Sequence, residues 1–259
     1  MTTNPYSAPA ATVADPAAAV QGKFIPGGRA VAAGHGWSWI AQGWDLFKRQ
    51  PGLWIGISIA LFVILLVLAI IPLLGPLANA VLWPVLSAGL LLGCRALAEG
   101  GNLEFGHLFA GFRERFGTLI AVGAISFGIS FAIGILVAVV MGVGMFTMFG
   151  GGPGPDAAPE ALMTMTLAML VMFALLLPLM MALWFAPALV VFHERGPVEA
   201  MQESFVGCLK NIVPFLVYGL IALVFAILAS IPIGLGWLLL GPVLIGSLFA
   251  SYRDIYLEA

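Results

Sequence analysis

Three histidines are the residues of this sequence best suited to metal chemistry. His35, His107 and His193 are spread along the chain outside its long apolar runs, and imidazole nitrogens are common zinc ligands. If the parts of the chain that carry them surround one axis, the three rings form a three-histidine site. None of them has the HxxxH or HExxH spacing that places two ligands on one helix face. The sequence therefore favours three separate interfacial histidines, and we expect neither a metal nor a cofactor.

The other reactive side chains form no catalytic or redox motif. Cys94 and Cys208 have no CxxC spacing, so free thiols are the expectation. The sequence contains no GxSxG elbow and no Walker loop, and we find no carboxylate pair on one face. Ionisable residues inside membrane helices usually mark proton, ion or substrate pathways, and the centres of the apolar runs have none. We therefore expect a protein that is not an enzyme.

The composition indicates a chain that lies in a lipid bilayer. Apolar residues make up 62% of the 259 residues and charged residues 8%, whereas about a quarter of a soluble domain is charged. Four runs lack Asp, Glu, Lys and Arg, at residues 50–94, 116–155, 161–192 and 211–252. Each run exceeds the roughly 20 residues that cross a bilayer as a helix. A water-soluble fold is excluded, and a net charge of −2 without basic clusters argues against nucleic acid as a partner.

Proline and glycine divide these runs into six predicted spans. Residues 72–76 supply a turn within the first run, and residues 231–236 supply one within the last run. The predicted spans are 51–71, 76–95, 117–145, 161–191, 212–231 and 236–252. A seventh span within 116–155 would place Arg195 on the opposite side from Arg115, so the parity of the crossings favours six.

The lysines and arginines predict the orientation of these spans. With six spans, all ten fall on one side: Lys23, Arg29, Lys48, Arg49, Arg95, Arg113, Arg115, Arg195, Lys210 and Arg253. The loops on the other side carry only Asp156 and Glu160. Under the positive-inside rule the basic side is cytoplasmic. We therefore expect both the N-terminus and the C-terminus in the cytoplasm.

A similar amphipathic segment precedes each predicted pair of spans. The apolar stripes are Trp37, Ile40, Ala41, Trp44 and Phe47 in the first segment, Phe105, Leu108, Phe109, Phe112 and Phe116 in the second, and Val198, Met201, Phe205, Cys208, Leu209 and Ile212 in the third. Helical spacing of this kind predicts helices that lie at the membrane interface. The predicted fold is an all-α integral membrane protein with six transmembrane helices in three hairpins, each preceded by a cytoplasmic interfacial amphipathic helix.

This pattern also predicts the domain organisation. Residues 1–34, rich in Ala, Pro and Gly, are expected to form a flexible cytoplasmic tail. Residues 35–259 then form a single membrane domain with units at about 36–98, 102–195 and 196–256. Whether these units are a true internal repeat stays open, because residue identity between them is weak.

The aromatic faces of the three segments and their basic neighbours form a candidate interface for lipids or a partner. Its residues are Trp37, Trp44, Phe47, Phe109, Phe112, Phe205, Lys48, Arg49, Arg113, Arg115 and Lys210. Pro187 is a candidate structural kink in the fourth span. We expect an integral membrane protein that acts through contacts with membrane lipids, a partner protein or a second copy of the chain. The alternative is a transporter or channel for an unidentified solute.

The least generic stretch of the chain carries a resemblance to known families. Residues 185–201 read FAPALVVFHERGPVEAM, residues 36–40 read GWSWI, and residues 44–47 read WDLF. Over about residues 29–255 the chain resembles an uncharacterised, BPSS-type family of proteobacterial six-span inner-membrane proteins. The exit from a span through proline into a helix with Ser204 is more loosely similar to the membrane domain of glycerophosphodiester phosphodiesterases. The first resemblance implies a bacterial inner membrane with cytoplasmic ends, and neither implies a catalytic residue.

Overall fold

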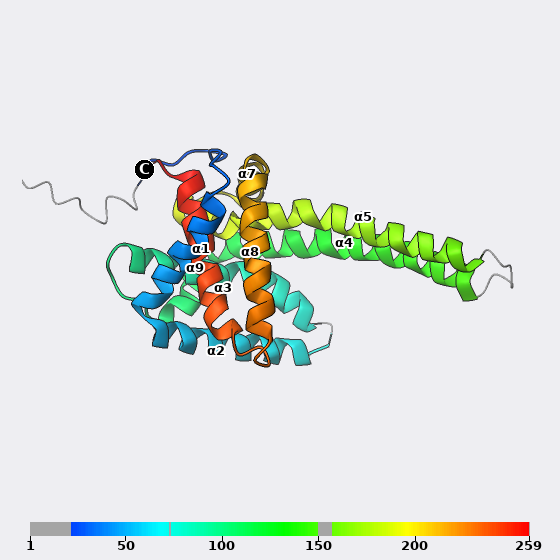
Figure 1. The fold of residues 1–259 in the computed structure, drawn as a ribbon, viewed down its shortest axis with the longest axis horizontal. Coiled ribbons are helices and arrows are strands. Elements are labelled where there is room, and N and C mark those ends of the chain that lie inside the picture. Colours follow the sequence, from blue (N-terminus) through cyan, green and yellow to red (C-terminus); the bar gives the residue numbers. More distant parts are fainter. Residues whose placement is uncertain (1–21, 73, 150–156, 259) are drawn as a thin grey trace, which may run out of the picture.

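The computed structural model describes residues 22–72, 74–149 and 157–258, and these ranges are mostly helical. The elements are α1 (His35–Arg49), α2 (Pro51–Ile70), α3 (Leu74–Ala98), the 3₁₀ helix η2 (Phe105–Phe112), α4 (Phe116–Phe149), α5 (Ala157–Trp184), α6 (Ala186–His193), α7 (Pro197–Lys210), α8 (Ile212–Ser230) and α9 (Trp237–Tyr256). Figure 1 shows their arrangement. The predicted all-α class is confirmed.

Six helical stretches in these ranges are long and apolar enough to cross a membrane. They are Pro51–Ile70, Leu74–Ala98, Phe116–Val143, Leu162–His193, Ile212–Ser230 and Trp237–Tyr256. Each coincides with a predicted span to within a few residues, which confirms their number and their places in the sequence. The fourth stretch consists of α5 and α6 together.

Two of these stretches, α3 and α9, and the α6 part of the fourth stretch supply much of the core of the molecule. In α3 and α9, 56% of the most apolar window is buried, against 11% in α2 and α4. Ala186, Ala188 and Val190 in α6 are fully buried, and α3 contacts both α6 and α9. The helices α3, α6 and α9 are therefore inner helices, whereas α2, α4 and α8 expose most of their surface.

Each short helical element packs against helices outside the hairpin that it precedes. Thus α1 packs against α8 and α9, η2 against α3, and α7 against α5, and Figure 1 shows α1 beside α9. At the crossing of α1 and α9, the backbones of Gly43 and Gly246 touch, and a Cβ atom on Gly43 would lie 2.3 Å from the carbonyl oxygen of Val243. Such a close approach requires glycine, so these two residues fix where α1 crosses α9.

The face with which α1 packs differs from the predicted one. Trp39 and Leu46, which the predicted stripe leaves out, are buried, whereas Trp37 and Trp44 are exposed. Phe47 is 4% exposed, so its assignment to a surface for lipids or partners is wrong. The helix is apolar on more than one side, and the contacts with α8 and α9 select the side that is buried.

The second predicted amphipathic helix is a 3₁₀ helix. With three residues per turn, Leu108 and Gly111 share one face and are buried, while Phe109 and Phe112 share another and are exposed. A Cβ atom on Gly111 would lie 2.0 Å from the carbonyl oxygen of Val85 in α3. This close contact with α3 favours the 3₁₀ helix over the wider α-helix.

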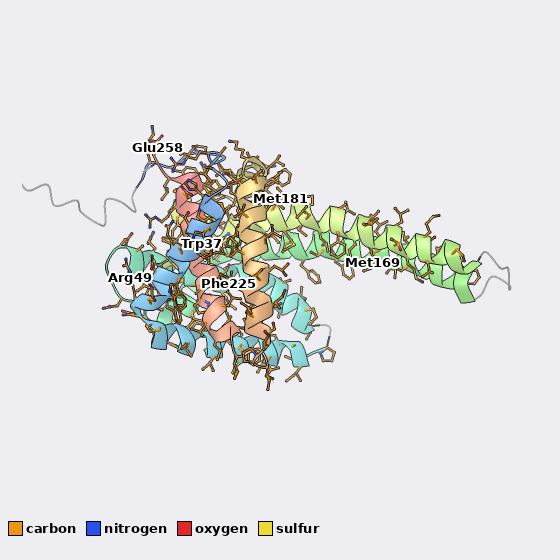
Figure 2. The ribbon with its side chains drawn as sticks, viewed as in Figure 1. Trp37, Arg49, Met169, Met181, Phe225 and Glu258 are labelled. Carbon is orange, nitrogen blue, oxygen red and sulfur yellow. The ribbon has the colours of Figure 1, made fainter. Side chains whose placement is uncertain are left out.

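The α4–α5 hairpin extends away from the other helices. Figure 1 shows it running across the direction of α8 and α9, and Figure 2 shows side chains projecting from it, with Met169 labelled. Phe131 and Phe173 are each 60% exposed. Exposed apolar surface on this scale is unfavourable in water, so the hairpin is suited to contact with lipid chains.

The predicted flexible tail is wrong for residues 22–34. The amide N–H of Ile25 donates to the carbonyl of Tyr256, and that of Arg29 donates to the carbonyl of Ile255, each at 2.8 Å. The buried side chain of Asn211 holds the same segment, because it donates to the carbonyl of Arg29 and accepts from the amide of Val31. The segment therefore packs on the end of α9, while residues 1–21 lie outside the described ranges.

The fourth span is interrupted at Phe185, where α5 ends and α6 begins. Pro187 lies in the first turn of α6, where its missing N–H costs little. Ser204 of α7 bridges backbone groups of the last turn of α5 at the break, because its hydroxyl accepts from the amide of Phe185 at 2.9 Å and donates to the carbonyl of Met181 at 2.7 Å. A side chain from another helix thus satisfies backbone groups that the break leaves free.

Candidate functional site

Eight of the ten basic residues of the chain gather where α3, α6 and α9 end, a region here called the charged end. Its members come from separate segments: Arg29, Arg49, Arg95, Arg113, Arg115, Arg195, Lys210 and Arg253. The guanidinium of Arg49, at the end of α1, donates to the carbonyl of Leu97 in α3. Arg115, before α4, pairs with Glu194, after α6. Folding therefore brings together cations that the sequence predicts to lie on one side of the membrane.

Asp254 connects the N-terminal segment and α1 to α9. Its carboxylate accepts hydrogen bonds from Nδ1 of His35 at 2.5 Å and from Nε1 of Trp39 at 2.9 Å. Arg29 lies 3.5 Å from the same carboxylate and donates through Nε to the backbone carbonyl at 2.8 Å. Trp39 is fully buried, so without Asp254 its indole N–H would lack an acceptor.

Other candidate cations bind backbone or carboxylate oxygens of the protein. Lys210 donates to the carbonyls of Gly27 and Gly28 at 3.1 and 2.9 Å. Lys48 pairs with Asp45 at 2.8 Å, and both side chains are more than half exposed. An exposed pair of this kind contributes little to stability, whereas Lys210 fastens the N-terminal segment to α7.

The three histidines have separate partners, which contradicts a shared three-histidine site. His35 binds Asp254, His107 binds the backbone of Glu104, and Nε2 of His193 lies 2.5 Å from the hydroxyl of Tyr252. Within the described ranges no cluster of three His, Cys, Asp or Glu side chains could hold a metal ion. The histidines lie on different elements that pack through different neighbours.

Burial and charge alter the acidity of three groups at the charged end. Burial raises the pKa of the Glu203 carboxyl, although Arg195, 3.3 Å away, acts in the opposite direction. Burial also raises the pKa of the Cys208 thiol to about 12, so this cysteine is protonated at neutral pH and is a poor nucleophile. A hydrogen bond from Arg115 lowers the pKa of Glu194.

Four phenylalanines form an exposed row that we call the aromatic ridge: Phe105, Phe109, Phe112 and Phe116. Successive rings contact one another, with centroids 6.5, 6.3 and 5.5 Å apart. Each ring is between 38% and 46% exposed. The ridge thus presents a continuous apolar edge at the charged end of the molecule.

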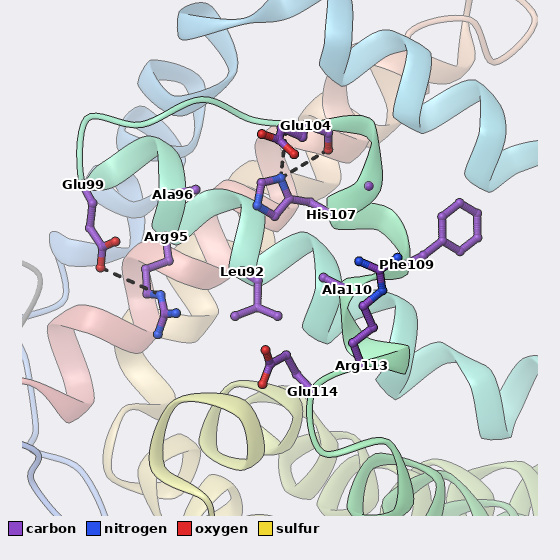
Figure 3. Close-up of a pocket in the computed structure, with 11 residues that line it drawn as sticks. Leu92, Arg95, Ala96, Glu99, Glu104, His107, Phe109, Ala110, Arg113 and Glu114 are labelled. Carbon is purple, nitrogen blue, oxygen red and sulfur yellow. Dashed lines mark hydrogen bonds and ion pairs between the residues drawn. The ribbon is translucent and has the colours of Figure 1, made fainter.

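A cavity of about 470 Å³ lies beside the ridge, between α3 and η2. Figure 3 shows Arg95 and Arg113 on opposite sides of it, with Glu114 near Leu92 between them. Glu99 also lines the cavity and pairs with Arg95 at 3.8 Å. Carboxylates and guanidinium groups occur together here, so the cavity has no marked preference for either sign of charge.

The two exposed tryptophans of α1 line an apolar groove. Trp37 and Trp44 face Phe225 of α8 and Leu239 of α9 across a groove of about 580 Å³, and Figure 2 labels Trp37 and Phe225. Phe205, the remaining aromatic candidate, is half-buried in α7. The predicted aromatic candidates therefore separate into the ridge, this groove and the interior.

Several residues of the charged end escaped sequence reasoning. Asp254 and Asn211 act through partners far away in the chain, and their types alone do not indicate them. Trp39 and Ser204 appear in the segments that carry the family resemblances, but those resemblances indicate no partner for either residue. One available signal was a spacing shared by two inner helices. Pro84 and Arg95 in α3 have the same separation as Pro242 and Arg253 in α9, which marks two equivalent arginines at equivalent helix ends.

No family model and no solved structure matches the chain. The chain is 30% identical over 222 residues to the curated "Probable inner membrane protein BTH_II0599" of Burkholderia thailandensis. The matched region covers 81% of this chain and 79% of that protein. Together with the six apolar helices, this relationship shows that the chain belongs to a family of bacterial multi-pass inner-membrane proteins.

Proposed function

We propose that the protein is not an enzyme and that it acts through lipid or protein contacts made by its charged end on the cytoplasmic side of the inner membrane. The orientation is supported by the gathering of cations from separate segments at one end. Cytoplasmic loops of membrane proteins carry an excess of lysine and arginine. Both chain ends would then lie in the cytoplasm.

The aromatic ridge is the observation that carries this proposal. Its rings are exposed although they stack on one another, and Arg113 adjoins it without an ion pair to any carboxylate in the described ranges. Aromatic rings beside basic side chains are typical of surfaces that enter the lipid headgroup layer. Instead of lipid headgroups, a partner protein could bury the same rings.

Hydrogen bonding within the spans supports a contact role over transport of a solute. Ser87, Ser126 and Ser247 are buried, and each hydroxyl donates to a carbonyl of its own helix. A solute path needs polar groups that turn toward a shared channel. The hydroxyl groups of these serines instead form their hydrogen bonds within their own helices.

We further propose that three units, each a short amphipathic element followed by a hairpin, interlock around the inner helices. The packing of α1 on α8 and α9, of η2 on α3 and of α7 on α5 supports this view. The looser similarity of the exit from a span through proline into the helix with Ser204 to the membrane domain of glycerophosphodiester phosphodiesterases stays a sequence prediction. It supplies no reacting group to the proposal.

The test is a pair of double variants at the ridge. Phe109→Asp with Phe112→Asp places charge on the apolar edge, whereas Phe109→Leu with Phe112→Leu keeps it apolar. Both positions are exposed, so the fold should tolerate either change. The proteins would be extracted in native-lipid discs, and the co-purifying lipids and proteins measured by mass spectrometry.

We expect the aspartate variant to lose a bound lipid class or a partner that the leucine variant retains, while both insert into the membrane. An unchanged set of lipids and proteins around the aspartate variant would refute the proposal. Solute flux in liposomes that contain the wild-type protein would instead support the transporter.

A further inference from the structure

The three inner helices end around a cavity of about 360 Å³. We call it the arginine pocket and define it by Arg95 and Glu99 from the end of α3, Phe192 and His193 from α6, and Tyr252 and Arg253 from α9. Ligand sites in proteins have volumes of roughly 300–1,000 Å³, so the pocket suits a small group. It is separate from the aromatic ridge, whose phenylalanines do not line it.

The arginine pocket has more positive than negative charge. Glu99 is its carboxylate, and this group pairs with Arg95 at 3.8 Å. Arg253 forms no ion pair with any carboxylate of the described residues. The neighbouring Asp254 is held by His35 and Trp39. One guanidinium group is therefore available for an anion from outside the chain.

Aromatic rings hold the two guanidinium groups in place. Cζ of Arg95 lies 5.1 Å from the ring centroid of Phe192, and Cζ of Arg253 lies 5.9 Å from that of Phe249. Stacking of this kind orients the flat guanidinium without using its N–H donors. The hydroxyl of Tyr252, fixed by Nε2 of His193 at 2.5 Å, adds a further polar group to the wall.

A helix-end effect explains part of this arrangement. Arg95 and Arg253 both lie in the last turn of their helices, where a cation complements the helix dipole. The helix dipole would be complemented equally well if the two side chains pointed into solvent in different directions. It does not account for the convergence of two arginines from two helices on one cavity, nor for Arg49, which lines the adjoining cavity with Arg253.

We propose that the arginine pocket binds the phosphate group of an anionic ligand. Guanidinium groups recognise phosphate through paired N–H donors, and basic pockets between transmembrane helices on the cytoplasmic side bind anionic lipid headgroups. The phosphate belongs either to such a headgroup or to a soluble phosphorylated compound. This proposal goes beyond contacts at the aromatic ridge and uses different residues.

The experiment uses the full chain purified in an uncharged detergent and has two arms. In the soluble arm, inorganic phosphate is titrated and the shift in melting temperature is recorded. In the lipid arm, native mass spectrometry counts bound phosphatidylglycerol and cardiolipin, with zwitterionic phosphatidylcholine as the reference lipid. Arg253→Gln is the main variant because Arg253 forms no ion pair with a described residue, and Arg253→Lys keeps the charge if the first variant is unstable.

Lys48→Gln is the matched control. It also removes one positive charge, but Lys48 is exposed and does not line the pocket. We expect Arg253→Gln to weaken binding at least roughly tenfold, which corresponds to about 1.4 kcal/mol, because it removes a charged hydrogen-bond donor. Lys48→Gln should bind like the wild type, and Arg253→Lys should bind with intermediate affinity.

Binding in the lipid arm identifies a headgroup, and binding in the soluble arm identifies a phosphorylated compound. Equal binding by wild type and Arg253→Gln in both arms would overturn the proposal, as would an equal loss in Lys48→Gln. The ridge variants retain every residue of the arginine pocket. The two experiments can therefore refute the proposal for the arginine pocket and the proposal for the aromatic ridge independently.

Discussion

Single polar residues that are buried or half-buried hold the charged end together at the residue scale. Asp254, Ser204 and Asn211 each bind groups from distant parts of the chain. A buried polar group without a partner costs about 1–3 kcal/mol, so these residues fix which segments lie together. The distribution of lysine and arginine along the sequence predicted which loops share one side of the membrane with these residues. It could not predict their partners, because hydrogen-bond geometry depends on helices that are far apart in sequence.

Glu203 gives a prediction for the pH dependence of stability. Burial raises its pKa above the ordinary 4.5, so the folded protein holds this proton more tightly than the unfolded chain. The stabilisation from Glu203 is therefore fully present below pH 4.5 and is lost as the pH rises through the raised value. Glu203→Gln cannot titrate, so it should lose less stability over this range.

The measurement for Glu203 is thermal unfolding of both proteins in detergent from about pH 4 to about pH 8. The melting temperature of the wild type, relative to that of Glu203→Gln, should fall as the pH increases. A constant difference would show that Glu203 does not titrate differently in the folded state. A rising difference would show that the ion pair with Arg195 outweighs burial.

At the element scale, hydropathy predicted the helices better than the faces with which they pack. The spans are identified by the length needed to cross the bilayer, and all six were found. In α1, tryptophans point to both sides, so periodicity alone could not tell buried Trp39 from exposed Trp37. The 3₁₀ geometry of η2 was missed for a related reason, since it depends on contact with α3.

The crossing of α1 and α9 gives a prediction about glycine. Gly43→Ala introduces a Cβ atom 2.3 Å from the carbonyl oxygen of Val243, so we expect a loss of about 1–3 kcal/mol in stability. Gly56→Ala in α2 is the control, because nothing lies within 4 Å of its Cβ position. It should leave stability unchanged or raise it by up to about 1 kcal/mol.

Unfolding of the two glycine variants in detergent, by heat or denaturant, measures this difference. If Gly43→Ala is as stable as Gly56→Ala, the two helices do not cross as closely as described. A loss in both variants would indicate a general sensitivity of the helices to alanine.

At the scale of the whole molecule, the proposed function depends on one arrangement: six spans with the basic residues of the charged end on one side. The sequence predicted this arrangement from charge and span parity, because the bilayer constrains both. It did not predict that residues 22–34 pack on α9. It also did not predict that α1, η2 and α7 each pack against helices outside the hairpin that they precede. Those features depend on contacts between distant segments, which no local pattern encodes. The aromatic ridge and the arginine pocket can meet cytoplasmic ligands only if the charged end faces the cytoplasm.

Single-cysteine labelling in intact bacterial cells tests this orientation most directly. In a chain with Cys94→Ala and Cys208→Ala, Ile233→Cys marks the turn between α8 and α9, where Ile233 is 97% exposed, and Glu258→Cys marks the charged end. A membrane-impermeant maleimide should label Ile233→Cys in intact cells and Glu258→Cys only after the inner membrane is opened. Labelling of Glu258→Cys in intact cells, or labelling of both sites from the same side, would contradict the account.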